Sequence, residues 1–488
     1  MAVAREALSR IVPNEDVMDS PEVLEVYASD HSFAHELKPC FVVKVKNVEQ
    51  VKALIKLANH TGTPLVPVSS GPPHFRGDSV PSALGAVIVD LSGMKRIIHI
   101  DPRNRMALVE PGLTYAELQP ELAKKGLRIS SPISPRANKS VIASLLEREP
   151  IVIPRLQWAF HDPLRCREVV WGHGQRMATG EAEGKGTLEE EWAEKFAQVS
   201  PRGPGQTDFY KLVSAAQGSM GIVTWASIKC EQLPQIHKLY FVPSNKLEEL
   251  IDISYEILRI RFGDELLILN NWQLASLMGK DSADVIALAG QYPQWMLLVG
   301  IAGRERMPEQ RVAYQEKDLS EMAQGAGLQL LSVIPGASAD EVLKTILNPS
   351  KEPYWKMKHK GDFQDIFFLS TLDRSPEFVK AMYKVADVEG YSIAEIGTYI
   401  QPIHQGASCH IEFNLPFDRS NKKEFSRVKD LYVRASEELL RLGAYYSRPY
   451  GIWAEMAFNL DAQTTIALRK IKDIFDPENI MNPGKLCF

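Results

Sequence analysis

The spacing of apolar residues predicts a helix and then a strand early in the chain. Apolar residues recur at three- and four-residue intervals at Val51, Leu54, Ile55 and Ala58. This spacing places them on one face of a helix. Gly62 is expected to end the helix, because glycine readily adopts the left-handed conformation of a C-cap. The apolar segment PLVPV that follows, residues 64–68, is typical of a strand.

The next apolar segments predict three more strands and a second helix. GAVIVDLSGM contains one strand, and IIHIDPRNRMALVEPG contains two strands around a DPRN turn. TYAELQPELAKKGL reads as a helix with Thr114 as its N-cap, Glu117 completing a capping box and Gly126 at its end. The order helix–strand–loop–strand–strand–strand–helix predicts an α+β fold. It differs from the strict alternation of strands and helices in a dinucleotide-binding fold.

The pattern changes character further along the chain. A polar, glycine-rich stretch over residues 179–208 predicts an exposed excursion. After LPQ at residues 233–235, helices and strands alternate in larger blocks, which predicts a second domain over residues 238–444. Helix TTIALRKIKDIF and the tail DPENIMNPGKLCF then close the chain.

Composition narrows the class of protein. A chain of 488 residues predicts two or three domains. A net charge of −5 gives no support for nucleic-acid binding. No apolar run reaches the roughly 18–20 residues of a membrane helix, and the N-terminus lacks an apolar signal core, so we expect a cytoplasmic protein. The five cysteines form no CxxC pair, which argues against an iron–sulfur or zinc-ribbon module.

The loop PVSSGPPHFRGD, residues 67–78, supports two interpretations. Its serines, glycines and Arg76 could present donors to a phosphate. Pro72 and Pro73, however, have no N–H to donate, and a proline turn between strands is also common. The loop alone therefore does not identify a phosphate site.

The segments around this loop carry a family resemblance. DLSGMKRIIHID, VEPGLTYAEL, AQGSMGIVT and PENIMNPGK follow it in this order. With them, the chain resembles the FAD-linked oxidoreductases of the vanillyl-alcohol oxidase and para-cresol methylhydroxylase type, most strongly over residues 40–234 and 440–488. The resemblance implies a two-part FAD-binding domain formed by residues 1–237 and 445–488. Residues 238–444 would form an α+β cap domain with an antiparallel sheet.

The resemblance also implies which residues hold FAD. The diphosphate loop corresponds to Ser69, Ser70, Gly71, Pro72, Pro73, His74 and Gly77, and the two prolines depart from the glycine-richer loop of the family. Pro111 lies in the EPG segment near the flavin. Ser140 matches a flavin-lining stretch in which Ala143 and Ser144 replace the family's glycine and asparagine. The adenine end corresponds to Gly218, Ser219, Gly221, Ile222 and Val223. Arg448 and Lys485 are expected near the flavin ring.

Substrate chemistry is expected from two stretches. GAYYSRPYG resembles a family segment in which a Tyr-Arg pair holds a phenolate: Arg448 matches the arginine, Ser447 replaces the tyrosine, and Tyr446 could supply the phenol group. In SCHIEF, alternation places Ser408, His410 and Glu412 on one face of a strand. His404 and His410 could act as bases or polar contacts, could bind a metal with Glu412, or could be structural histidines. A histidine in this neighbourhood can bond covalently to flavin in the family, so covalent attachment stays open.

The expected function is transfer of a hydride from a small alcohol or para-substituted phenol to flavin N5. One alternative is a 2-hydroxy-acid dehydrogenase with a metal at His404, His410 and Glu412. Another is a flavin subunit of an electron-transfer complex, whose partner would be an electron-acceptor protein. We expect a small-molecule substrate, a homo-oligomer, and no nucleic-acid or membrane partner.

Overall fold

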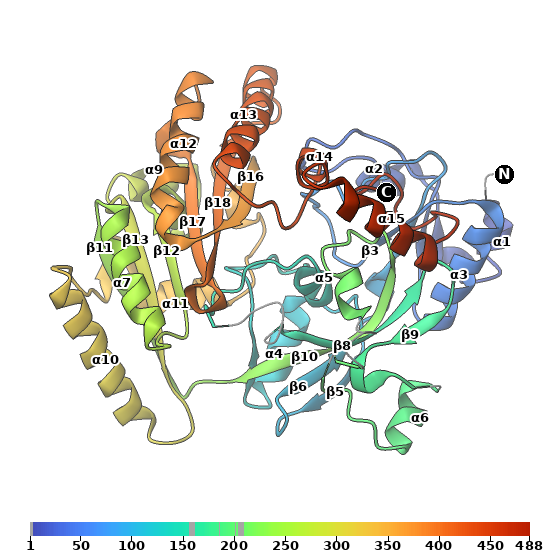
Figure 1. Ribbon diagram of the computed structural model, residues 1–488, viewed down its shortest axis with the longest axis horizontal. Helices are drawn as coiled ribbons and strands as arrows, with labels where there is room; N and C mark the ends of the chain where they lie inside the picture. The colour runs from blue at the N-terminus through green and yellow to red at the C-terminus, as the bar shows by residue number, and fades with distance from the viewer. Residues whose placement is uncertain (1–2, 156–161, 185, 201, 204–208) are drawn as a thin grey trace.

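The computed structural model describes residues 3–155, 162–184, 186–200, 202–203 and 209–488. Within these ranges the strands form a four-stranded sheet, two six-stranded sheets and a two-stranded ribbon, β14 (Val333–Ile334) with β15 (Ala337–Ser338). Figure 1 shows the third large sheet and its helices on one side of the molecule and the first two sheets on the other. The predicted α+β class is confirmed.

The four-stranded sheet begins the fold. Its order is β1 (Val17–Met18), β2 (Phe41–Lys44), β4 (Val87–Asp90) and β3 (Leu65–Val68), and β2, β4 and β3 run parallel. Nearby helices are α1 (Arg5–Leu8), α2 (Pro21–Ala28) and α3 (Val48–Thr61). As predicted, α3 buries one apolar face and ends at Gly62, whose φ is 65°. Because β3 is the last strand in this order, the loop between β3 and β4 lies at the edge of the sheet.

The second sheet has the order β5 (Ile97–Asp101), β6 (Met106–Val109), β10 (Gly221–Gln232), β8 (Leu164–Trp171) and β9 (Arg176–Ala178), and β7 (Leu127–Ile129) also pairs with β10. Its helices are α4 (Tyr115–Ala123), α5 (Val141–Leu146) and α6 (Leu188–Ala193). The predicted capping box of Thr114 and Glu117 starts α4. The turns before α4 and α5 lie against each other, with a bridge between Thr114 and Ser140.

The third sheet is antiparallel, as predicted for the cap. Its order is β11 (Ile236–Ser244), β13 (Trp295–Gly303), β12 (Leu266–Asn270), β17 (Gly397–Ile403), β18 (Ser408–Phe417) and β16 (Asp362–Ser370). One face packs on α7 (Leu247–Arg259), α10 (Pro308–Gly325), α12 (Ser375–Val388) and α13 (Lys422–Arg441). The other face is covered in part by α8 (Asn271–Met278), α9 (Ser282–Ala289) and α11 (Ala339–Leu347). The remaining part of that face turns toward the first two sheets.

The end of the chain returns to the first sheet through α14 (Ile452–Phe458) and α15 (Ala462–Phe475) (Figure 1). The amide of Leu65 in β3 donates to Ile480 at 2.7 Å, and the amide of Asn482 donates back to Leu65 at 2.8 Å. The tail therefore extends the sheet beside the β3–β4 loop. In the described ranges, none of the helices has the length and apolarity needed to cross a bilayer.

Candidate cofactor and substrate site

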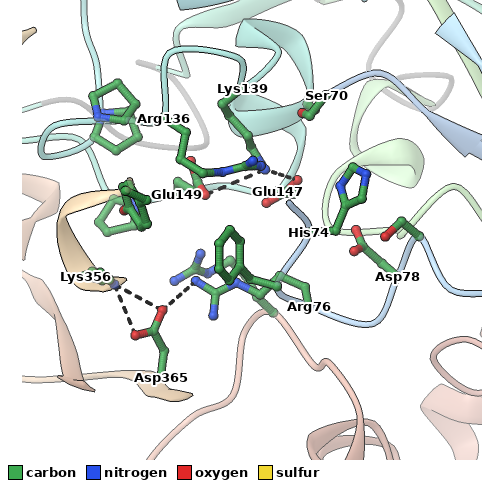
Figure 2. A pocket seen from close by; sticks show the side chains of 18 of the residues that line it. Ser70, His74, Arg76, Asp78, Arg136, Lys139, Glu147, Glu149, Lys356 and Asp365 are labelled. Atoms are coloured by element: carbon green, nitrogen blue, oxygen red, sulfur yellow. Dashed lines mark hydrogen bonds and ion pairs between the residues drawn. The ribbon is translucent and has the colours of Figure 1, made fainter. Parts of the chain in front are cut away.

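A deep cavity lies where the β3–β4 loop, residues 132–150 and the open face of the third sheet meet (Figure 2). It encloses about 1050 Å³ of space, part of which is open to solvent. A second cavity of about 720 Å³ lies against β10 and α5. The two share as lining residues Pro67, Ser69, Asp78, Ala143 and Glu147. The first cavity lies between the two halves of the molecule, and the second continues from it beside the second sheet, an extent that suits a long dinucleotide cofactor.

Residues of the β3–β4 loop line the first cavity, and several of their backbone amides have no protein acceptor among the described residues. In the described part of the chain, no protein group accepts from the amides of Ser69, Ser70, His74, Phe75 and Arg76. The loop contains two prolines, so its donors are fewer than in a glycine-rich loop. Two further amides are already used. Gly71 donates to the carbonyl of Asn138 at 3.0 Å, and Gly77 donates to Asp30 at 2.6 Å.

Three of the sequence-predicted cofactor residues meet at the start of α5. Ser140 is its N-cap and accepts from the amide of Ala143 at 3.1 Å. The amide of Ser140 donates to the Ser70 hydroxyl at 3.0 Å, and the Ser140 hydroxyl donates to the carbonyl of Pro111 at 2.5 Å. These bonds join the loop to the EPG segment and to α5.

Gly218, just before β10, and Gly221, its first residue, allow close packing at the second cavity. A Cβ on Gly218 would lie 2.4 Å from the Pro67 side chain, and one on Gly221 would lie 2.6 Å from the Val170 carbonyl. Ile222 and Val223 also line this cavity. Ser219 differs, because its buried hydroxyl donates to the Ala216 carbonyl at 2.7 Å and it does not line the second cavity. Glycine is required at positions 218 and 221, and at position 218 it allows close contact with Pro67 before the β3–β4 loop.

Side chains of the C-terminal tail donate hydrogen bonds to backbone carbonyls of the β3–β4 loop. Lys485 donates to the carbonyls of Gly77 at 2.7 Å and Val80 at 2.9 Å. Asn482 donates to the carbonyls of Asp78 at 2.9 Å and Gln217 at 2.7 Å. The Lys485 side chain therefore contacts the backbone of the loop that the sequence predicts to surround the diphosphate.

The opposite wall carries a buried group of charges on β16 and β18. Lys356 pairs with Asp365 at 3.0 Å, and Arg76 of the loop also pairs with Asp365 at 3.0 Å (Figure 2). Lys356 pairs in addition with Glu412 at 2.5 Å. Burial opposes the charge on Lys356, but the two carboxylates raise its pKa. Burial alone would raise the pKa of Glu412, but Lys356 and His410 hold it well below its usual value. Glu412 therefore faces the cavity as a carboxylate.

Arg448 and Arg76 lie close to the same ring. The guanidinium carbon of Arg448 is 3.9 Å from the centroid of Phe367, and that of Arg76 is 4.5 Å from it. Arg448 lines the main cavity and is only 4% exposed. Arg76 is paired with Asp365, whereas the Arg448 guanidinium makes no ion pair or hydrogen bond with protein in the described ranges. Arg448 is thus a buried cation left open to a ligand.

The two predicted histidines lie in different surroundings. His410 is buried on β18, and its Nε2 lies 3.2 Å from Glu412. Since Glu412 is ionised and can only accept, this nitrogen carries the proton. His404 lies in the turn between β17 and β18. The alternate residues of this strand, Cys409, Ile411 and Phe413, face the core, so the predicted separation of the two faces is confirmed.

The described residues do not gather His404, His410 and Glu412 into a group able to hold a metal. The gathered His/Asp/Glu group is instead His237, Asp264 and Glu265. Its carboxylates are neutralised by neighbouring arginines: Arg128 contacts both, and Arg155 and Arg304 contact Asp264. This group ties β7 to the third sheet by ion pairs.

The pKa of His410 predicts a pH effect on stability. Burial lowers this pKa from 6.5 to about 4, although Glu412 opposes the shift. Below pH 6.5 His410 binds a proton in the unfolded chain but stays neutral in the folded chain. The free energy of unfolding therefore decreases as the pH is lowered. Between about pH 7 and about pH 5, the wild type should lose about 2 kcal/mol more stability than His410→Gln. Urea denaturation at both pH values measures this difference, and equal losses would show that His410 is not buried as a neutral group.

Tyr446 is built into the core beside α13. Its hydroxyl donates to the carbonyl of Ser436 at 2.8 Å, and its ring stacks on Trp453 at 4.9 Å between centroids. It does not line the main cavity, whereas Tyr354 and Tyr399 do. A catalytic role for Tyr446 stays a prediction, and these two tyrosines are nearer candidates for contact with a substrate.

Several polar lining residues were not identified from the sequence as functional, namely Arg136, Lys139, Glu147, Glu149, Lys356 and Asp365. Lys139 pairs with Glu147 at 2.5 Å and lies 3.8 Å from Glu149. Asp365 had a usable signal, because it interrupts the apolar strand DFQDIFFLS. Of the others, Lys139, Glu147 and Glu149 lie beside the two ends of α5, Arg136 contacts the β3–β4 loop, and Lys356 contacts residues of β16 and β18.

The residues present fit FAD. Loop amides without protein partners, two glycines that admit no Cβ, and two adjoining cavities are what a bound dinucleotide needs. Ser69, Ser70 and the amides of His74, Phe75 and Arg76 would hold its diphosphate, and Gly221, Ile222 and Val223 its adenine end.

Comparison with known proteins supports FAD as the cofactor. Residues 39–142 match a family described as an FAD binding domain, and residues 275–486 match the C-terminal domain of FAD linked oxidases, together roughly two thirds of the chain. An uncharacterized FAD-linked oxidoreductase of Mycobacterium tuberculosis is 22% identical over 98% of this chain and 97% of its own length. The glycolate oxidase subunit GlcD of Bacillus subtilis is 23% identical over 99% of this chain and 96% of its own.

The fold is also known from solved structures. The structure of p-cresol methylhydroxylase with substrate bound superposes with a TM-score of 0.83 at 18% identity, covering 99% of this chain and 96% of that one. The chain therefore belongs to the FAD linked oxidases, its fold is that of p-cresol methylhydroxylase, and its cofactor is FAD.

Proposed function

We propose that this enzyme transfers a hydride from a small alcohol or para-substituted phenol to FAD, with Arg448 holding the ionised substrate oxygen. The observation that carries this proposal is the unpaired guanidinium of Arg448 in the cavity wall. A buried charge without a partner is costly, and an oxyanion is the ligand that relieves it. The same guanidinium can stabilise negative charge that develops during reaction.

The other lining residues have complementary roles in this proposal. When bound, FAD supplies the hydride acceptor. Tyr354, Phe363 and Tyr399 line the cavity, exclude water and provide flat apolar surfaces for a ring. Glu412, held ionised by Lys356, accepts a hydrogen bond from a substrate hydroxyl. His410 does not line the cavity and acts on the substrate through Glu412.

A 2-hydroxy acid is the second candidate substrate. It is supported by the full-length similarity to the glycolate oxidase subunit of Bacillus subtilis and by Arg448, which suits a carboxylate equally well. A metal-assisted reaction of this acid has weaker support, because the Glu412 carboxylate already pairs with Lys356.

Anaerobic titration distinguishes the two. A para-alkylphenol or benzylic alcohol should bleach the absorbance at about 450 nm that is typical of oxidised flavin. Bleaching by 2-hydroxy acids alone would contradict the preferred substrate class. One bound zinc or similar ion per chain, measured by elemental analysis, would support the metal-assisted alternative.

Reoxidation requires an acceptor outside this chain. The five cysteines are free thiols, and none of them forms a CxxC pair. We propose that oxygen or a separate electron-acceptor protein takes the electrons. A purified, stable homo-oligomer that turns over with oxygen alone would rule out the obligate protein acceptor.

A further inference from the structure

The first half of the cofactor loop presents carbonyl oxygens to residues 136–138. Arg136 Nη1 donates to the carbonyls of Gly71 at 3.1 Å and Pro73 at 2.5 Å. Asn138 Nδ2 donates to the carbonyl of Pro72 at 2.5 Å. Since neither proline has an N–H and the Gly71 amide is occupied, this half of the loop offers a phosphate very few donors.

Arg136 is a cation at this point without an acidic partner. Its side chain is buried, with 7% of the residue exposed, and it lines the main cavity. In the described ranges its hydrogen-bond partners are the two loop carbonyls and the Asn138 side-chain oxygen, and all three bonds use Nη1. The guanidinium also lies over the Phe75 ring, 5.2 Å from its centroid. Its Nε and Nη2 groups therefore remain free to donate to a ligand.

The neighbouring basic side chains do not offer a phosphate an unpaired positive charge. Lys139 is neutralised by Glu147 and Glu149, and Arg76 by Asp365, as Figure 2 shows. His74 is buried with its Nε2 lacking a partner, and burial, with Arg136 nearby, lowers its pKa to about 3. It is therefore neutral at physiological pH.

We propose that Arg136 is a diphosphate ligand of FAD in this protein, and that it replaces the amide donors lost at Pro72 and Pro73. A guanidinium can give two parallel charged hydrogen bonds to phosphate oxygens. The bonds from Nη1 to the loop carbonyls fix its orientation before the cofactor arrives. This role concerns cofactor binding and is independent of which substrate the enzyme oxidises.

The test measures binding to flavin-free protein, with FAD, ADP and adenosine as probes. Loss of charged hydrogen bonds in Arg136→Met should weaken FAD and ADP binding by about 10- to 100-fold. Adenosine, which lacks the diphosphate, should bind with unchanged affinity. Arg136→Lys should recover part of the ADP affinity, because it retains the charge. Arg103→Met, which removes an exposed arginine from the turn between β5 and β6, is the matched control and should bind all three probes like the wild type.

A purely structural role gives a different result. Arg136→Gln can still donate to one loop carbonyl but carries no charge. If Arg136→Gln binds ADP as tightly as the wild type, or if Arg136→Met weakens ADP and adenosine equally, the residue only shapes the loop and the proposal is overturned. Wild-type protein that binds FAD but oxidises no phenol or alcohol would count against the proposed substrate class and leave this result unaffected.

Discussion

Replacing Arg448 by methionine should lower the rate constant of flavin reduction on the order of 100-fold while FAD content stays near that of the wild type. The substitution keeps much of the side-chain volume over Phe367 and removes the charge that faces the cavity. Anaerobic stopped-flow absorbance of the flavin measures the rate constant, and the visible spectrum measures FAD content.

The control is Arg103→Met, which removes an equal charge at an exposed turn. It should reduce at the wild-type rate. Equal loss of flavin content and reduction rate in Arg448→Met would make Arg448 a cofactor-retention residue instead. A wild-type rate in that variant would remove Arg448 from the substrate site.

Replacing Lys356 by methionine should destabilise the protein by about 3–5 kcal/mol, because it leaves buried carboxylates without their shared cation. Asp365 and Glu412 are 1% and 5% exposed, and Lys356 contacts both. Asp365 keeps Arg76, so most of the loss is expected to come from Glu412. Urea denaturation measures the free energy of unfolding.

Lys358 provides a matched control in the same segment. Lys358 donates to the carbonyls of Leu277 and Gly279. Lys358→Met should therefore lower the free energy of unfolding less than Lys356→Met, because it leaves no carboxylate without a cation. The double variant Lys356→Met/Glu412→Gln should regain part of the lost stability. A cost below about 1 kcal/mol for Lys356→Met would mean that water in the cavity solvates the carboxylates.

Features set by local sequence were predictable. The apolar spacing located α3, Thr114 and Glu117 located the start of α4, and alternation placed His410 and Glu412 on one face of β18. Each depends on residues a few positions apart, and such short-range patterns survive in the folded chain.

Features that depend on distant partners were not predictable. The Gly71 amide looked available for a phosphate, but the carbonyl of Asn138 accepts from it. Arg136 carried no signal of its own, because its role follows from two carbonyls more than sixty residues away in sequence. Lys356 belongs to a short turn, and only the pairing of β16 with β18 brings Asp365 and Glu412 around it.

The central claim is that Arg448 binds the substrate oxygen as an anion beside the flavin. The most direct test is the ionisation of a bound nitrophenol, whose phenolate absorbs in the visible, followed by difference spectra of the FAD-loaded enzyme against pH. An opposite charge within reach lowers an acid's pKa by about 1–3 units, so the bound ligand should ionise at least about one unit below the free compound. Arg448→Met should abolish this shift. A nitrophenol that binds the wild type in its neutral form, or that shows the same shift in Arg448→Met, would contradict the claim.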